Sequence, residues 1–180
     1  MNKTERFNSI SHLIGAALAL VGAVALILVA LQDGDTYRIV SFSIYGVTLF
    51  LLYSISTIYH GLPPGSAKRV FRMLDHQAIY LLIAGSYTPF MLITLKGVVG
   101  WWMLAAIWSM ASVGLVLDAL PRFSKRVLQM GLYFVMGWLI LLAIRPLLAA
   151  LPQAGFVWLL TGGILYSSGV VFYALDQRYP

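Results

Sequence analysis

Six long apolar runs, separated by short polar connections, dominate this sequence. Each run is long enough to cross a membrane, because one helical crossing needs about 20 apolar residues. Only helices and closed barrels satisfy their backbone groups in lipid, and these continuous runs lack the alternation of barrel strands. The sequence therefore predicts an all-α, polytopic transmembrane helical bundle that forms a single domain over residues 1–180. The predicted spans are residues 11–31, 39–59, 77–95, 98–117, 127–144 and 154–175.

The composition excludes an ordinary soluble domain. Hydrophobic residues make up 61% of the chain and charged residues 10%, whereas about 25% charged residues is usual in soluble proteins. The net charge of +6 does not indicate nucleic-acid binding, because the basic residues lie between apolar runs without an aromatic stacking platform. The chain has no cysteine, which excludes disulfides and thiolate metal sites. The run from Leu13 to Leu31 is too long for a signal-peptide core and is expected to remain as a span.

Basic residues are divided unevenly between the two sides of the predicted membrane. One side carries nine of them: Lys3, Arg6, Lys68, Arg69, Arg72, Arg122, Lys125, Arg126 and Arg178. The other side carries three, which are Arg38, Lys96 and Arg145. Because the cytoplasmic side of a membrane protein carries the excess of Lys and Arg, this asymmetry predicts a cytoplasmic N-terminus. An even number of spans returns the C-terminus to the same side.

The histidines gather near the predicted cytoplasmic face. His12, His60, Asp75 and His76 all lie there, while the central parts of the spans contain no Asp, Glu, Lys, Arg or His. Proton pumps and coupled transporters usually carry ionisable or unwound polar groups near the midplane of the membrane. The pattern therefore favours a pocket that opens toward the cytoplasm over a path through the membrane.

Ser56, His60 and Asp75 form the candidate site. Ser56 and His60 are four residues apart and share one face of the second predicted helix, about 6 Å apart along its axis. A short basic loop leads to the third span, so Asp75 is expected to face His60 across the gap. Imidazole is a natural zinc ligand, and a nearby carboxylate can bind the metal, orient the imidazole or take a proton from water. A hydroxyl one turn deeper can hydrogen-bond to that water or to a developing oxyanion.

Each of these residues also has a structural interpretation. Polar residues at helix ends are ordinary at membrane interfaces, and Asp75 can favour the positive end of the third helix. Ser56 can serve as a hydrogen-bonding residue between helices. Each residue taken alone fits a structural role. The functional interpretation of Ser56, His60 and Asp75 rests on their expected proximity.

Two other features are expected to be structural. Gly15, Ala19 and Ala23 recur at four-residue spacing on the first predicted helix, which favours close approach of a neighbouring helix. The segment SYTP at residues 86–89 predicts a helix kink, in which Ser and Thr hydroxyls satisfy backbone groups that proline sets free.

Several motifs together resemble the hemolysin III family, the bacterial branch of the progestin and adipoQ receptor (PAQR) proteins, which are also described as membrane homeostasis proteins. They are ERFNSISHLIG at residues 5–15, STIYH at 56–60, DHQAI at 75–79 and AGSYTP at 84–89. The resemblance implies a seven-helix bundle in the cytoplasmic (inner) membrane with an intramembrane zinc site that opens toward the cytoplasm. It assigns a zinc-ligand role to His60, the motif serine to Ser56 and a contact with metal-bound water to Asp75.

The sequence departs from the family pattern in one respect. The other two zinc histidines of the family come from a His-x-x-x-His motif on helix seven, and no histidine follows His76 here. One protein ligand cannot make the usual three-ligand catalytic zinc site. Two expectations remain open: a chain truncated at its C-terminus, or a six-span variant without the family metal site. His12 and His76 lie near the same face, but nothing in the sequence places them beside His60.

The leading functional hypothesis is a zinc-dependent hydrolase of the ceramidase type, active when complete, which acts on an acyl amide or similar lipid bond. In it, zinc is held partly by His60, Asp75 acts as general base, and Ser56 positions water or the oxyanion. The alternative is a non-catalytic membrane sensor or interaction protein. A pore-forming hemolysin is disfavoured by the lack of a charged lining. The expected partners are membrane lipids.

Overall fold

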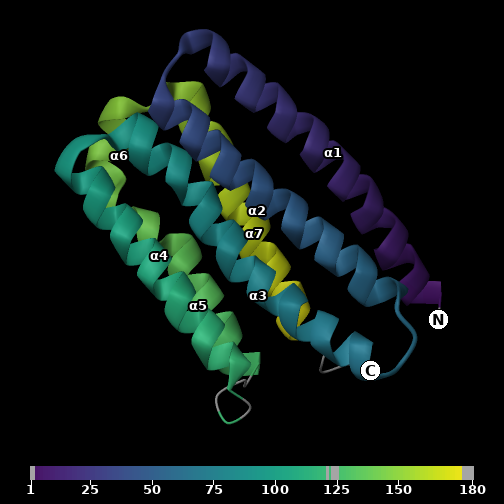
Figure 1. Ribbon diagram of the computed structural model, residues 1–180. Coiled ribbons are helices and arrows are strands. Elements are labelled where there is room, and N and C mark those ends of the chain that lie inside the picture. The colour runs from purple at the N-terminus through teal and green to yellow at the C-terminus, as the bar shows by residue number, and fades with distance from the viewer. Residues whose placement is uncertain (1–2, 121, 123–125, 176–180) are drawn as a thin grey trace.

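The computed structural model describes residues 3–120, 122 and 126–175, and all of its regular structure is helical (Figure 1). Lys125 and Arg178, which contributed to the predicted charge asymmetry, lie outside the described residues. The elements in chain order are α1 (Lys3–Asp33), α2 (Thr36–Gly61), α3 (Ser66–Pro89), the π-helix η1 (Phe90–Leu95), α4 (Gly97–Ala119), α5 (Arg126–Trp138), the 3-10 helix η2 (Leu139–Ala143), α6 (Ile144–Ala150) and α7 (Gln153–Leu175).

Six helical stretches in the described part of the chain are long and apolar enough to cross a membrane. Two of them are composite, because α3 continues into η1, and α5, η2 and α6 form one stretch. Large apolar side chains such as Leu18, Val116 and Trp158 are exposed on the outward faces, as expected for helices that lipid surrounds. The predicted all-α transmembrane fold is confirmed.

Helix α3 lies in the middle of the bundle (Figure 1). It packs against α2 on one side and against α4 and α5 on the other. Helix α1 packs along α2 at the edge of the bundle, and α7 packs against α5. The main buried core therefore lies around α3, α4 and α5, with Tyr80, Met91, Ile107 and Met136 among its most buried side chains.

Two helices start well before the predicted spans, by eight residues or more. Helix α1 begins at Lys3 rather than residue 11, and α3 begins at Ser66 rather than residue 77. The predicted basic loop is therefore wrong, because its charged residues lie on the first turns of α3: Lys68, Arg69 and Arg72. Hydropathy marks the part of a helix that lies in hydrocarbon, whereas backbone hydrogen bonding continues into the polar interface. Asp75 consequently lies inside a helix and not at its start.

The predicted close packing of α1 is confirmed. A Cβ atom added at Gly15 would lie 2.7 Å from Cδ1 of Tyr53 on α2, and one added at Gly46 would lie 2.5 Å from Cβ of Ala23. Ala19 is buried in the same interface. Small residues thus bring the two helices close together, and this contact sets which residues of α1 lie opposite which residues of α2.

The expected use of hydroxyls around Pro89 is found only in part. Ser86 and Thr88 do bond to backbone carbonyls, but not to the carbonyl of Gly85, which Pro89 leaves without its helical N–H donor. Ser86 Oγ donates to the carbonyl of Ile83 at 2.7 Å, and Thr88 Oγ1 donates to that of Ala84 at 2.9 Å. Beyond Pro89 the helix continues as the wider η1. The hydroxyls therefore bond to carbonyls in the turn just before the change in helix type.

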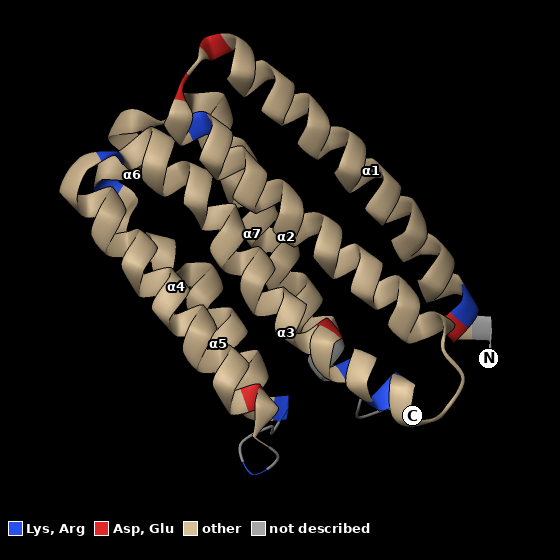
Figure 2. Ribbon diagram, in the orientation of Figure 1, with Lys and Arg blue, Asp and Glu red and all other residues tan. Residues whose placement is uncertain are grey.

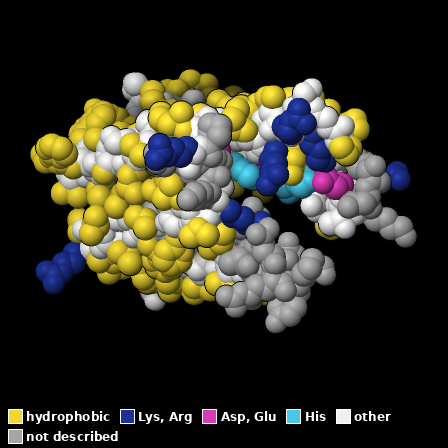
Figure 3. Space-filling view, turned by 90° about the horizontal axis from the view of Figure 1, so that it is seen from below, with side chains coloured by type: hydrophobic (Ala, Val, Ile, Leu, Met, Phe, Trp, Pro, Cys, Tyr) yellow, Lys and Arg dark blue, Asp and Glu magenta, His cyan; other side chains and the backbone are white. Residues whose placement is uncertain are grey.

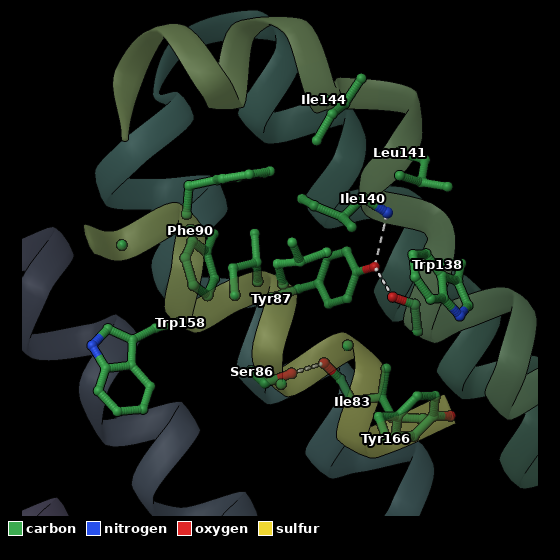
Figure 4. A pocket seen from close by; sticks show the side chains of 17 residues that line it. Ile83, Ser86, Tyr87, Phe90, Trp138, Ile140, Leu141, Ile144, Trp158 and Tyr166 are labelled. Carbon is green, nitrogen blue, oxygen red and sulfur yellow. Dashed lines mark hydrogen bonds between the residues drawn. The ribbon is translucent and has the colours of Figure 1, made fainter. Parts of the chain in front are cut away.

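A break in the fifth membrane-crossing stretch was not predicted. The hydroxyl of Tyr87 on α3 donates to the carbonyl of Met136 at 2.8 Å. It also accepts from the backbone N–H of Ile140 at 2.9 Å (Figure 4). It thus stands between the end of α5 and η2 and satisfies backbone groups on both sides. Lipid offers no replacement for lost backbone hydrogen bonds, so this side chain stabilises the break.

Candidate functional site

The polar groups of interest lie at the end of the bundle where α1 begins, α2 ends and α3 begins. Helices α1 and α2 run antiparallel, so the start of α1 lies beside the end of α2 (Figure 1). Five side chains interact there, and we call them the histidine cluster. They are Glu5, His12, Ser56, His60 and Lys68.

Ser56 and His12 form the deeper contact of the cluster. Ser56 Oγ lies 2.6 Å from Nδ1 of His12. Ser56 is only 3% exposed, because it faces α1 rather than lipid. The interpretation of Ser56 as a hydrogen-bonding residue between helices is therefore correct, and its partner is a histidine.

His60 and Lys68 meet the same carboxylate. Oε2 of Glu5 lies 3.2 Å from Nδ1 of His60 and 2.9 Å from Nζ of Lys68. The His60 and Lys68 side chains are 17% and 18% exposed. Lys68 also donates to the carbonyl of Leu62 at 3.1 Å. One oxygen of α1 thus joins the end of α2 to the first turns of α3.

Aromatic rings pack around these polar atoms. The His12 and His60 rings lie edge to face with their centroids 5.6 Å apart. Tyr59 packs beside His60 at 4.6 Å, and the Lys68 ammonium lies 5.1 Å from the centre of the Tyr59 ring. Both histidines are therefore held on several sides.

Asp75 and His76 lie outside this network of contacts. The Asp75 carboxylate acts electrostatically on His12, but it has no hydrogen-bond or ion-pair partner among the described residues. His76 lies within electrostatic range of Asp118 and Arg126 of the α4–α5 side, and its carbonyl accepts from the Tyr133 hydroxyl at 2.7 Å. Of the two additional histidines, the structure brings His12 to His60 and leaves His76 apart.

Charged residues gather toward the two ends of the bundle (Figure 2). At the end that carries the histidine cluster, histidine side chains reach the surface beside Lys and Arg side chains (Figure 3). The described basic residues of the opposite end are Arg38, Lys96 and Arg145. There Arg38 pairs with Asp33 and with Asp35. The cluster is therefore accessible from the more basic face of the molecule.

The described residues do not by themselves fit a zinc ion. His60 is of the right ligand type. Among the side chains that the structure describes, however, no three His, Cys, Asp or Glu residues are grouped so that they could hold a metal ion. A catalytic zinc site has three protein ligands. His60 can thus be one ligand, while the described set lacks the others.

Two members of the histidine cluster, Glu5 and His12, were not part of the candidate site predicted from the sequence, although their spacing indicated a shared helix face. Glu5 and His12 are seven residues apart, which places them on the same face of a helix. Their partners on α2 could not be derived, because the packing of Gly15 against Tyr53 determines which turn of α2 each residue meets. Lys68 was missed because its segment was predicted as a loop.

A cavity of about 540 Å³ lies elsewhere, between α3, the broken α5–η2–α6 stretch and α7 (Figure 4). Its walls include Tyr87, Phe90, Trp138, Trp158 and Tyr166, and no Asp, Glu, Lys, Arg or His is among its described lining residues. This apolar cavity suits a hydrocarbon group. The phenols of Tyr87 and Tyr166 in its wall both donate to backbone carbonyls.

Comparison with known proteins places the chain in a family of membrane proteins. The sequence model of the family described as "Haemolysin-III related" matches residues 1–180. The chain is 46% identical over 177 residues to "Hemolysin-3" of Bacillus cereus, covering 97% of this chain and 80% of the relative. It is 45% identical over 173 residues to "Hemolysin-3 homolog" of Bacillus subtilis (strain 168), covering 95% and 80%.

A human protein is also similar over almost the whole chain. The "Monocyte to macrophage differentiation factor" of Homo sapiens is 29% identical over 178 residues, which is 96% of this chain and 72% of the human protein. The resemblance drawn from the sequence motifs is confirmed: the chain belongs to the haemolysin-III related family of membrane proteins.

Proposed function

We propose that the histidine cluster and Asp75 are part of a lipid-hydrolysing centre at the cytoplasmic face of the bacterial inner membrane. The observation that carries this proposal is the contact of Ser56 with His12 at 2.6 Å, with the rings of His12 and His60 5.6 Å apart. A hydroxyl and two imidazoles held together at the end of a lipid-facing bundle can act on a bond near the headgroup region. The proposed substrate is an acyl amide or a similar lipid bond.

Each residue has a proposed role. Asp75, a carboxylate within electrostatic range of His12, accepts a proton from the attacking water. His12 fixes the Ser56 hydroxyl in place, and this hydroxyl hydrogen-bonds to water or to the developing oxyanion. His60 would be one protein ligand for zinc, and the metal would supply Lewis-acid polarisation of the scissile carbonyl.

The basic residues support the proposed orientation. The described end beside the cluster carries Arg6, Arg69, Arg72, Arg122 and Arg126 in addition to Lys68. Such an excess favours the cytoplasmic side of the membrane. A lipid substrate would then enter from the inner leaflet and meet the cluster at headgroup depth.

Hydrolysis by the purified full chain tests the proposal. The protein would be placed in lipid nanodiscs that contain ceramide, and released fatty acid and bound zinc would be measured by mass spectrometry. We expect release that falls about 10²–10⁴-fold with Asp75→Ala and bound zinc that falls with His60→Ala. The control is Asp33→Asn, which removes an exposed ion-pairing carboxylate at the opposite end. Zinc at background level, together with release that neither variant lowers, would overturn the proposal.

A second candidate is a non-catalytic sensor of membrane lipids with a role in membrane homeostasis. The apolar cavity beside Tyr87 favours it, because Trp158, a wall residue, is 76% exposed and the cavity therefore reaches the lipid-facing surface. Full complementation of a membrane-fluidity defect by Asp75→Ala would support this candidate. Loss of complementation together with loss of hydrolysis would exclude it.

A further inference from the structure

Glu5 makes a contact that the proposed reaction does not yet use. Its Oε2 atom lies 3.2 Å from Nδ1 of His60. Lys68 donates to the same oxygen at 2.9 Å. The Glu5 side chain is 27% exposed, so the carboxylate is partly withdrawn from water while it makes both contacts.

Lys68 is held in position by contacts of its own, and it therefore holds the Glu5 carboxylate in position. Its Nζ donates to the carbonyl of Leu62 at 3.1 Å and lies 5.1 Å from the centre of the Tyr59 ring. An ammonium group has only hydrogens to donate, so Glu5 faces it as an acceptor. A carboxylate that pairs with an ammonium in this way is ionised, and an ionised carboxylate can only accept from His60.

This arrangement determines which nitrogen of His60 carries hydrogen. In neutral imidazole one nitrogen is a donor and the other an acceptor. Because Glu5 can only accept, Nδ1 of His60 is the donor, and in the neutral imidazole Nε2 then keeps its lone pair. The neighbouring His12 ring, 5.6 Å away and nearly perpendicular, leaves the His60 ring little freedom to turn over.

We propose that Glu5, held in place by Lys68, is a positioning residue that fixes the His60 imidazole with Nδ1 as donor and presents Nε2 to the reaction site. The inference rests on the proposed function only for the chemical role of Nε2. The hydrogen-bond pattern itself exists without substrate or metal. Glu5 touches neither, and acts through His60.

A role of Glu5 as a tether between α1 and α2 would be redundant. Helices α1 and α2 are already joined by the Ser9 hydroxyl, which donates to the carbonyl of Thr57 at 3.0 Å, and by the packing of Gly15 against Tyr53. An ion pair that is partly exposed adds little stability to such an interface. The specific consequence of Glu5 is therefore the orientation of one ring.

Nitrogen NMR of the imidazoles tests this directly. The full chain has three histidines, so ¹⁵N-histidine labelling in lipid nanodiscs gives few signals, and a His60→Asn variant identifies those of His60. We expect His60 in the wild type to be the Nδ1–H form. We expect Glu5→Ala to convert it to the Nε2–H form, and Lys68→Met to retain the Nδ1–H form because Glu5 remains. Asp33→Asn, at the other end of the α1–α2 pair, is the control and should change nothing.

Two results would overturn the inference: a wild-type His60 in the Nε2–H form, or a Glu5→Ala protein that keeps the Nδ1–H form. Where Glu5→Ala does not fold, a wild-type His60 in the Nε2–H form still overturns the inference. Fatty-acid release provides the second measurement, with a fall of about 10²-fold expected for Glu5→Ala. A Glu5-dependent Nδ1–H form in a protein without hydrolysis would refute the proposed function and leave the positioning role intact.

Discussion

Ser56 Oγ lies 2.6 Å from Nδ1 of His12, and this contact joins α1 to α2 inside the buried interface between them. Its two partners are 44 residues apart in the sequence. The contact therefore depends on the antiparallel alignment of the two helices, and it is a sensitive point at which to test the site.

Ser56→Ala is expected to lower the free energy of unfolding by about 1–3 kcal/mol, because the His12 nitrogen loses its partner in a poorly hydrated place. Thermal unfolding in detergent, followed by circular dichroism, measures the effect. Thr57→Ala is the matched control, since the Thr57 hydroxyl bonds to Tyr53 within its own helix. Equal losses in the two variants would contradict the special role of the Ser56 contact.

His12→Gln and His76→Gln should separate the two histidines that the sequence left undecided. Of these two histidines, His12 is the one whose ring contacts His60 in the described structure. His12→Gln is therefore expected to reduce fatty-acid release about 10²-fold, while His76→Gln retains it. The measurement is the hydrolysis rate of each variant at equal protein concentration. Greater damage from His76→Gln would show that the catalytic group lies on the other side of α3.

Gly114→Ala is expected to destabilise the bundle by about 1–3 kcal/mol. The added Cβ would lie 2.4 Å from Cε1 of Tyr80, a ring in the buried core. Gly131→Ala is the control, because the described structure leaves open space around its Cβ position, and alanine there should stabilise the helix by up to about 1 kcal/mol. Unfolding temperatures that shift in the same direction for both variants would contradict the packing argument.

Tyr87→Phe is expected to loosen the break between α5 and η2, because the Ile140 N–H and the Met136 carbonyl lose their shared partner. The cost is about 1–3 kcal/mol, and amide hydrogen exchange should accelerate in η2. Tyr37→Phe, which changes a ring that is 52% exposed, serves as the control. Unchanged exchange at Ile140 in the Tyr87 variant would show that the break is stable without the hydroxyl.

The predicted orientation can be tested because the chain contains no cysteine. Arg69→Cys places a thiol at the end that carries the histidine cluster, and Thr36→Cys places one at the opposite end. A membrane-impermeant maleimide should label Thr36→Cys in intact cells and label Arg69→Cys only after the membrane is opened. The reverse pattern would put the cluster on the outer side.

The sequence was sufficient for the number of crossing helices and the charge asymmetry, because both follow from local composition. The ends of the helices could not be predicted from hydropathy, since α3 begins in a segment where the basic residues Lys68, Arg69 and Arg72 interrupt the apolar ones. The break in the fifth membrane-crossing stretch could not be predicted from the sequence either. The residues of η2 are uniformly apolar, and the side chain that stabilises the break is Tyr87 of another helix.

The candidate site was predictable in part for a similar reason. Ser56 and His60 are neighbours along one helix, so their spacing alone places them on one face. The contacts of Glu5 and His12 required the alignment of α1 against α2. The roles assigned to Asp75 and to zinc are chemical rather than geometric, and they stay predictions.

The position of α1 at the edge of the bundle has a consequence for biogenesis. Helices α1 and α2 are synthesised before α3, and N-terminal parts of a chain generally fold first. The contact between His12 and Ser56 and that between Glu5 and His60 therefore need only this first hairpin. Lys68 and Asp75 arrive with α3, so the polar centre is assembled in two stages during membrane insertion.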